Sequence, residues 1–219
     1  MTNHVLVDFG EVISHVQSPA AMRTMAELLG VPARAFTERY WGSRASYDRG
    51  LAAYDYWQLV AGRPVRGEEL LLLRRLDVEG WTRLNFETIA VLREARRRGA
   101  QLTLLSNAPS DLAVEVRASS VLAEIFTLMV FSAELRLAKP DGEIFDTALA
   151  LAESTPQDTL FVDDRWENIR AAGARGIRTH RFTTAQELQA VLAGIHFGDR
   201  QPRPWWTRRR AARSVSAPG

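Results

Sequence analysis

Acidic and polar side chains stand at the ends of several short apolar runs in this sequence. The run HVLVD ends in Asp8, and the run TLFVDD ends in Asp163 and Asp164. The run AQLTLLSN ends in Ser106 and Asn107. Carboxylate oxygens are the ligands that Mg²⁺ prefers in proteins, and a carboxylate can also act as a nucleophile. These residues indicate an oxygen-only metal site beside a carboxylate that is free to react.

A single lysine, Lys139, stands in the segment AKPDGEIF. Of the 28 basic residues, 27 are Arg and one is Lys, so this position needs something that Arg does not offer. An ammonium is a compact point charge that suits a phosphate, whereas the guanidinium fork is bulkier. Lys139 and Mg²⁺ together would neutralise a phosphoryl group, and the Ser106 hydroxyl would hold its oxygens at a helix start. The set therefore predicts phosphoryl transfer, with Asp8 attacking phosphorus to form an acyl phosphate.

The apolar pattern of the chain explains how these residues would meet. Short runs rich in Val, Ile, Leu, Phe or Thr predict strands at 4–8, 100–107, 125–132, 159–164 and 177–182. Helices are predicted between them, at 84–98, 109–121, 141–152, 167–175 and 184–193. This alternation favours an α/β fold with a Rossmann-like parallel sheet. Ligands of such sheets bind at the carboxyl ends of the strands, where the candidate residues stand.

One long interval after the first strand interrupts the alternation. It contains no convincing strand, and glycine and proline separate predicted helices at 19–29, 33–47, 52–61 and 67–76. We interpret it as an all-helical cap that covers the site like a lid. The expected organisation is a catalytic core of residues 1–14 and 84–199, a helical cap of residues 15–83, and an Arg-rich, disordered tail of residues 200–219.

Composition limits the other classes of function. Cysteine is absent, which excludes disulfides, thiolate catalysis and cysteine metal sites. No apolar run approaches 18 residues and no secretory signal is read, so we expect a cytoplasmic protein without a membrane partner.

The tail of residues 200–219 carries six Arg and no acid, and removing these charges from the net +2 leaves −4 for residues 1–199. Such a tail leaves nucleic-acid binding open without favouring it. A monomer or a homodimer is equally consistent with the sequence.

Four segments together resemble the haloacid dehalogenase (HAD) superfamily of hydrolases, of the phosphatase type with a helical (C1-type) cap. They are VLVDFGEVI, LLSNAP, AKPDGEIFDTAL and LFVDDRWENIRAAGARGI, in the order of the family, and the likeness covers residues 4 to about 194. The resemblance implies a Rossmann-like core, Mg²⁺ and an aspartyl-phosphate intermediate. The implied substrate is a small phosphorylated metabolite, with sugar phosphates as one candidate class.

Carried over by position, the resemblance assigns roles to particular residues. Asp8 becomes the nucleophile, and Ser106 and Lys139 hold the phosphoryl group. The implied metal ligands are Asp8, the Gly10 carbonyl, Asp163 and Asp164. The predicted substrate contacts are Ser106, Asn107, Lys139, Glu11, His15 and Arg44. Four aromatic residues at helical spacing are expected mostly in the core of the cap, namely Trp41, Tyr47, Tyr54 and Trp57.

The sequence departs from the family pattern at Gly10. Most family phosphatases have a second Asp there, which acts as general acid and base, a contribution of typically about 10²–10⁴-fold. Three explanations stay open. The substrate has a good leaving group or its own acid, Glu11 or His15 stands in, or the protein is a weak catalyst or a binder. A branch of the family that begins Asp-x-Gly makes an active enzyme credible.

Two rival functions remain at this level. A metal-independent 2-haloacid dehalogenase-like hydrolase would attack carbon through the same Asp8, but the pair Asp163 and Asp164 argues against it. A non-catalytic ligand-binding or regulatory protein would explain Gly10. A chelator should abolish activity in the phosphatase and leave a dehalogenase intact.

Overall fold

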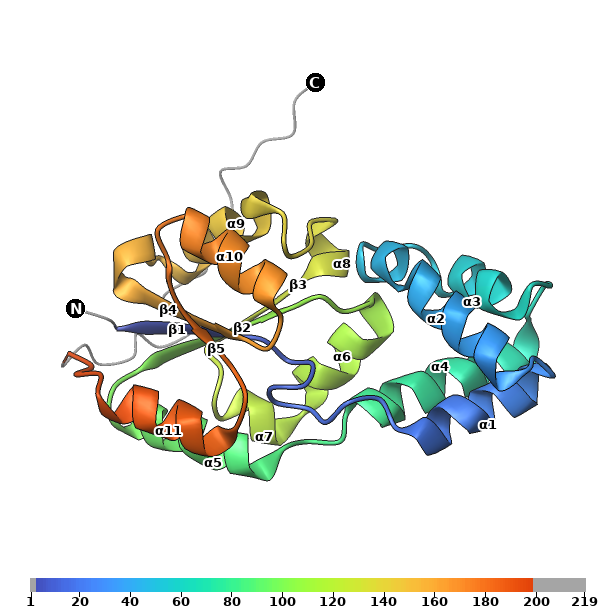
Figure 1. Cartoon of the computed structure of the whole chain (residues 1–219), viewed down its shortest axis with the longest axis horizontal. Helices are drawn as coiled ribbons and strands as arrows, with labels where there is room; N and C mark the ends of the chain where they lie inside the picture. The colour runs from blue at the N-terminus through green and yellow to red at the C-terminus, as the bar shows by residue number, and fades with distance from the viewer. Residues whose placement is uncertain (1–2, 199–219) are drawn as a thin grey trace, which may run out of the picture.

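A parallel sheet places the first strand at its centre. The computed structural model describes residues 3–198, and within them five parallel strands lie in the order β3-β2-β1-β4-β5 (Figure 1). The strands are β1 (His4–Val7), β2 (Gln101–Ser106), β3 (Leu128–Phe131), β4 (Thr159–Asp163) and β5 (Arg178–Arg181). The predicted α/β fold is confirmed.

Strand register brings the ends of the central strands together. Val7, the last residue of β1, lies opposite Leu104 of β2 and Val162 of β4. The chain therefore leaves these three strands at the same edge of the sheet. Asp8, Ser106 and Asp163 stand there, each one or two residues after the three paired residues. This is the edge at which ligands of open α/β sheets bind.

Helices cover both faces of the sheet because the central strands are apolar on both sides. One face packs against α5 (Phe86–Arg97), α6 (Ser110–Ala118), α7 (Ser120–Ala123) and α11 (Ala185–Ala193). The other face packs against α9 (Gly142–Ala152) and α10 (Trp166–Ala174). Val5 and Val7 point to the first layer and Leu6 to the second, as the alternation of side chains along a strand requires.

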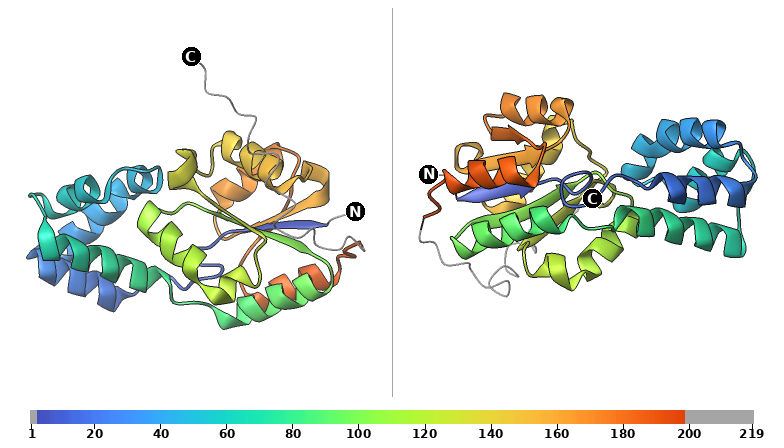
Figure 2. Two further views of the ribbon diagram at one scale, coloured as in Figure 1. Left: turned by 180° about the vertical axis from the view of Figure 1, so that it is seen from behind. Right: turned by 60° about the horizontal axis from the view of Figure 1, so that its bottom comes forward.

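The helical segment after β1 forms a lobe beside the sheet (Figures 1 and 2). Its helices are α1 (Pro19–Leu29), α2 (Ala33–Asp48), α3 (Ala53–Ala61) and α4 (Gly67–Trp81). Their buried side chains, such as Phe36, Trp57 and Leu73, form an apolar core that is separate from the two layers around the sheet. We call this lobe the cap and the sheet with its helices the core.

Three element boundaries differ from the sequence-based expectation by three residues or more. The last cap helix continues past 76 to Trp81, because Gly80 leaves room for the Gln17 side chain where a Cβ would lie 1.6 Å from its Oε1. The helix expected at 109–121 breaks at Ser119, whose extended backbone and hydroxyl begin α7. The third strand begins at Leu128 because the preceding residues still belong to a helical turn.

Polar contacts hold the cap against the core on two sides. Arg74 of α4 places its guanidinium fork on Asp111 of α6, with N···O distances of 2.6 and 2.5 Å. On the other side, Arg49 pairs with Asp141 at 2.7 Å, and the hydroxyl of Ser132 in α8 (Ser132–Leu135) donates to the Asp48 carbonyl. The cap is thereby positioned over the carboxyl edge of the sheet.

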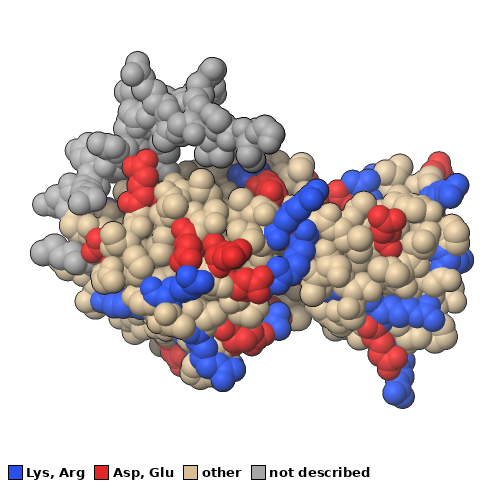
Figure 3. Space-filling model, turned by 90° about the horizontal axis from the view of Figure 1, so that it is seen from above, with Lys and Arg blue, Asp and Glu red and all other residues tan. Residues whose placement is uncertain are grey.

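The surface carries charges of both signs. On the face in Figure 3, Asp and Glu lie beside Lys and Arg over both lobes, and exposed pairs such as Arg175 with Asp146 join them. Across residues 3–198, no helix has the length and apolar character needed to cross a bilayer. The Arg-rich tail of residues 200–219 lies outside the described residues.

Candidate active site

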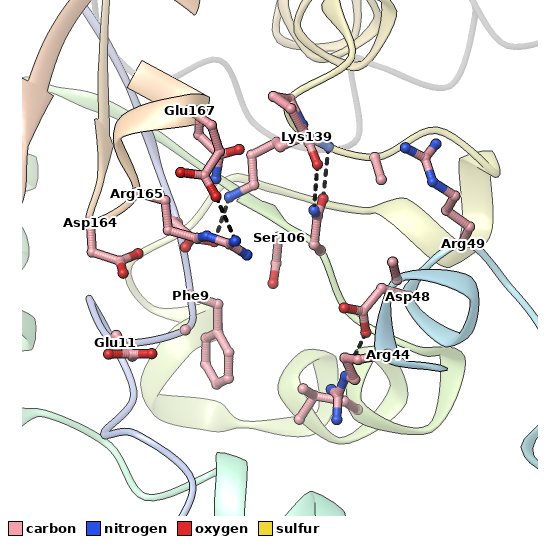
Figure 4. Close-up of a pocket in the computed structure, with 18 of the residues that line it drawn as sticks. Phe9, Glu11, Arg44, Asp48, Arg49, Ser106, Lys139, Asp164, Arg165 and Glu167 are labelled. Carbon is pink, nitrogen blue, oxygen red and sulfur yellow. Dashed lines mark hydrogen bonds and ion pairs between the residues drawn. The ribbon is translucent and has the colours of Figure 1, made fainter. Parts of the chain in front are cut away.

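A cavity of about 490 Å³ opens between the carboxyl edge of the sheet and the cap. Figure 4 shows side chains from both lobes pointing into it. The core contributes Asp8, Phe9, Gly10, Glu11, Ser106, Asn107, Leu112, Ala138, Lys139, Pro140, Asp164, Arg165, Glu167 and Asn168. The cap contributes Trp41, Arg44, Ala45, Asp48, Arg49 and Trp81. The predicted site residues Asp8, Ser106, Lys139 and Asp164 therefore meet in one place.

Lys139 is the centre of the polar contacts at the floor of the cavity. Its Nζ lies 2.6 Å from Asp8 Oδ1 and 2.8 Å from Asp163 Oδ2, and it donates to the Leu105 carbonyl at 3.0 Å. An ammonium has three N–H donors, so these oxygens match its full donor capacity. The side chain is 1% exposed. Arg would present its donors on a longer planar fork, so the compact ammonium suits this arrangement and accounts for a lysine at this position.

The two adjacent acids at the end of β4, Asp163 and Asp164, have different surroundings. Asp163 is completely buried, and its Oδ1 accepts from the Arg165 backbone N–H and from the Asn168 amide, both at 2.9 Å. Asp164 is half-buried and lines the cavity. Asp163 thus holds Lys139 and the start of α10 in position, and Asp164 places its carboxylate at the cavity.

The site holds the carboxyl groups of Asp8, Asp163 and Asp164 but a single ammonium, that of Lys139. When all three carboxyl groups are ionised, negative charge is therefore in excess. Burial raises the pKa of Asp8 to about 7, because Lys139 lowers it only in part and Asp163 raises it further. Burial and Asp163 also raise the pKa of Asp164 to about 6. Burial opposes the charge of Lys139, but Asp163 and Asp8 outweigh it and raise the lysine pKa.

Those carboxylates fit a divalent cation. Oxygen atoms of Asp8, Asp163 and Asp164 lie within 4.8 Å of one another. A cation placed among them would favour the ionised forms that burial disfavours. An all-oxygen donor set is the chemistry of Mg²⁺, so the residues present fit the metal that the sequence predicts.

Ser106 and Asn107 close the second side of the floor. Ser106 is buried at the end of β2 and lines the cavity. Asn107 forms a two-way clasp with the backbone of Lys139, donating to its carbonyl at 2.8 Å and accepting from its N–H at 2.9 Å. This clasp, which the sequence did not reveal, ties the loop of Lys139 to the end of β2.

The other predicted substrate contacts are placed differently. Glu11 is exposed at the cavity wall and has a left-handed backbone, with φ of 58°. His15 is exposed and does not line the cavity. Arg44 lines it, but its guanidinium pairs with Asp48 at 2.8 Å and with Asp77 at 3.3 Å. Its positive charge is therefore already balanced inside the cap.

Gly10 lies beside Asp8 with room for a larger residue. A Cβ there would meet Trp81 at 3.5 Å, an ordinary contact, and its φ lies outside the left-handed region. The absence of a side chain at position 10 therefore removes chemistry from the site without being required by space.

Some cavity residues were missed by sequence reasoning. Asp48 and Arg49 end a cap helix, and Arg165 and Glu167 follow the acidic pair. Trp41, expected in the cap core, is 45% exposed at the cavity. Charged residues at a helix end resemble ordinary solvated positions, so the local sequence does not distinguish them.

Comparison with known proteins agrees with this geometry. The family model of haloacid dehalogenase-like hydrolases matches residues 2–176. A phosphoserine phosphatase from Thermus thermophilus is 38% identical over 93 residues, which is 42% of this chain and 37% of that protein. A sesquiterpene phosphatase from Aspergillus oryzae is 27% identical over 152 residues, which is 67% of this chain and 77% of that protein.

A solved structure shows the same fold. It is a HAD family enzyme from Bacteroides thetaiotaomicron in complex with magnesium and inorganic phosphate, with a TM-score of 0.69 and 19% identity over 83% of this chain and 94% of that one. The family model spans most of the chain, and the strand ends carry the acids, the hydroxyl and the lysine described above. The protein therefore belongs to the haloacid dehalogenase-like hydrolases.

Proposed function

We propose that this chain is a Mg²⁺-dependent phosphomonoester hydrolase that acts on a small phosphorylated metabolite through an aspartyl-phosphate intermediate on Asp8. The observation that carries the proposal is the meeting of Asp8, Lys139 and Asp164 at the floor of one cavity. The phosphatases among its relatives support the same class of substrate. A cavity of about 490 Å³ suits a small ester.

The residues present supply each part of a two-step displacement. The Ser106 hydroxyl binds a phosphoryl oxygen, and Lys139 holds Asp8 Oδ1 in position while its positive charge attracts the phosphoryl group. Asp8 then forms a bond to phosphorus as the ester P–O bond breaks, and water later hydrolyses the acyl phosphate. Mg²⁺, held by the carboxylates of Asp8, Asp163 and Asp164 and by the Gly10 carbonyl, would supply positive charge that lets an anionic carboxylate approach an anionic phosphorus.

The electrostatics of the floor disfavour the metal-independent dehalogenase. That reaction requires the carboxylate of a haloacid to approach Asp8 with no metal ion beside the acids and, among residues 3–198, with Lys139 as the single cation in contact with their carboxyl groups. Asp163 and Asp164 already raise the pKa of Asp8 by repulsion, and a further anion would add to it.

The chelator experiment separates the three candidate functions. We expect the purified protein to hydrolyse para-nitrophenyl phosphate with Mg²⁺, to lose this activity in EDTA, and to regain it when Mg²⁺ is added back. A screen of phosphorylated metabolites under the same conditions would then identify the substrate. Halide release from 2-haloacids that persists in EDTA would instead favour the dehalogenase. Tight phosphate binding without any turnover would favour the binder.

Metal binding should also appear as a change in stability. Mg²⁺ in hundredfold excess over its dissociation constant should stabilise the parent by about 2.7 kcal/mol, seen as a higher Tm. Asp164→Asn removes the carboxylate that faces the cavity, so its Tm should respond far less to Mg²⁺. Asp55→Asn changes an exposed cap residue outside the cavity and should respond like the parent. An equal Mg²⁺ response in Asp164→Asn would remove that residue from the ligand set.

A further inference from the structure

A phosphate ester needs a proton on its leaving oxygen unless that oxygen leaves as a stable anion. Gly10, beside the nucleophile, has no side chain to supply it. The need for another proton donor rests on the proposed function. In phosphoryl transfer the attacking and leaving oxygens lie roughly in line through phosphorus. With Asp8 on the floor, the leaving oxygen must point toward the cap, so the donor should come from the cap wall.

The cap wall of the cavity holds a carboxyl group, that of Asp48. Its other described lining residues are two arginines, two tryptophans and an alanine. Asp48 is the last residue of α2, and its carbonyl accepts from Ser132 of the core. Ser132 Oγ also accepts from the Ala108 backbone N–H at 2.9 Å. Asp48 is thus fixed beside the segment that follows Ser106.

The two oxygens of the Asp48 carboxyl have different surroundings. Its Oδ1 accepts from Arg44 Nε at 2.8 Å. Figure 4 shows the group pointing into the cavity, with one oxygen joined to Arg44 and the other turned to the open space. The side chain is 14% exposed. One oxygen can therefore carry a proton toward a bound ester while the other holds the orientation.

The surroundings of Asp48 suit a group that both gives and takes a proton. Burial raises its pKa to about 6, although Arg44 lowers it; Asp77 from α4 raises it and Arg165 from the β4–α10 loop lowers it. A catalytic acid works best when its pKa lies near the working pH. After proton loss, the Arg44 guanidinium stabilises the carboxylate that remains.

We propose that Asp48 is the proton donor to the leaving group, in place of the side chain that Gly10 lacks. In the first step Asp8 bonds to phosphorus, the ester P–O bond breaks, and the released oxygen takes the proton of Asp48. In the second step water bonds to phosphorus, the Asp8–phosphorus bond breaks, and the Asp48 carboxylate takes a proton from that water. Asp8 and Asp48 both return to their starting forms.

The other acids at the cavity are placed less well for this task. Glu11 is exposed and lies near enough to Asp164 to raise its pKa, which puts it on the core side of the cavity. Glu167 is paired with Arg165 at 2.5 Å. Both belong to the core, from which Asp8 attacks.

A pair of esters that differ in leaving group tests the proposal. We would measure kcat/KM with Mg²⁺ for para-nitrophenyl phosphate and for unsubstituted phenyl phosphate. Nitrophenolate leaves without a proton, whereas phenolate needs one. Asp48→Asn should lose about 10²-fold or more on phenyl phosphate and little on the nitrophenyl ester. The parent's phenyl phosphate rate should fall as the pH rises through about 6, where Asp48 loses its proton at its raised pKa, and this fall should disappear in the variant.

Matched variants separate a chemical role from a structural one. Asp55→Asn should behave like the parent on both esters. Equal losses on both esters in Asp48→Asn would overturn the proposal and leave Asp48 as a support for Arg44. Selective loss in Glu11→Gln, with Asp48→Asn unaffected, would transfer the role to Glu11. A parent inactive on both esters would overturn the proposed function and this inference with it, and the parent rate alone reveals that case.

Discussion

Asp8→Asn is expected to remain folded and to lose hydrolysis of para-nitrophenyl phosphate by on the order of 10⁴-fold or more. Asn has the shape of Asp but offers no anionic oxygen to attack phosphorus, so the covalent route closes. The Lys139–Asp163 ion pair at 2.8 Å stays in place, which preserves the floor of the cavity. Steady-state rates with saturating Mg²⁺ and an unchanged Tm would together establish this outcome.

A direct test of the intermediate accompanies this variant. The parent, mixed in excess with labelled ester and quenched in acid, should carry one phosphoryl group that hydroxylamine releases, as an acyl phosphate does. Asp8→Asn should carry none, and Asp55→Asn should match the parent. A rate within tenfold of the parent for Asp8→Asn would remove Asp8 as the nucleophile.

Lys139→Met is expected to damage both activity and stability. The variant loses the positive charge that faces the phosphoryl group, and removing one such preorganised group typically costs about 10²–10³-fold in kcat. It also leaves Asp8 and Asp163 buried beside an apolar side chain. Breaking a buried ion pair costs about 3–5 kcal/mol, and we expect the lower end because Asp8 can take up a proton.

Urea unfolding at neutral pH in EDTA measures the stability loss, and kcat with Mg²⁺ measures the catalytic one. Arg34→Met provides the control, because Arg34 makes an ion pair with Glu38 on the cap surface, where its side chain is 92% exposed. Exposed pairs contribute little, so this variant should unfold with the parent. Equal stability of Lys139→Met and the parent would show that Lys139 does not hold the two acids together.

Much of the fold could be predicted because its signals are local. The buried central strand β1 carries three aliphatic residues in a row, and glycine and proline separate the cap helices at their ends. The errors in the ends of the predicted elements arose where contacts with residues distant in the chain change those ends. The predicted helix ended at 76, but the space that Gly80 leaves for Gln17 allows α4 to continue to Trp81.

The candidate site divides in the same way. Asp8, Ser106 and Asp164 could be chosen because each stands at the end of an apolar run, and Lys139 because it is the single lysine of the sequence. Asp48 and the clasp of Asn107 on Lys139 could not, because their partners lie more than thirty residues away in the chain or on the other lobe. No local pattern distinguishes such residues from solvated ones.

The sequence by itself determined the sheet, the helical segment and the set of residues able to carry out phosphoryl transfer. Strand and helix periodicity and residue chemistry are properties of short stretches of sequence, so they can be recognised without the fold. Only the tertiary structure decided which residues share the cavity. It pairs Arg44 inside the cap, leaves His15 outside, and turns Asp48 inward. Charge balance and burial depend on neighbours that packing brings together, and packing is a property of the whole chain.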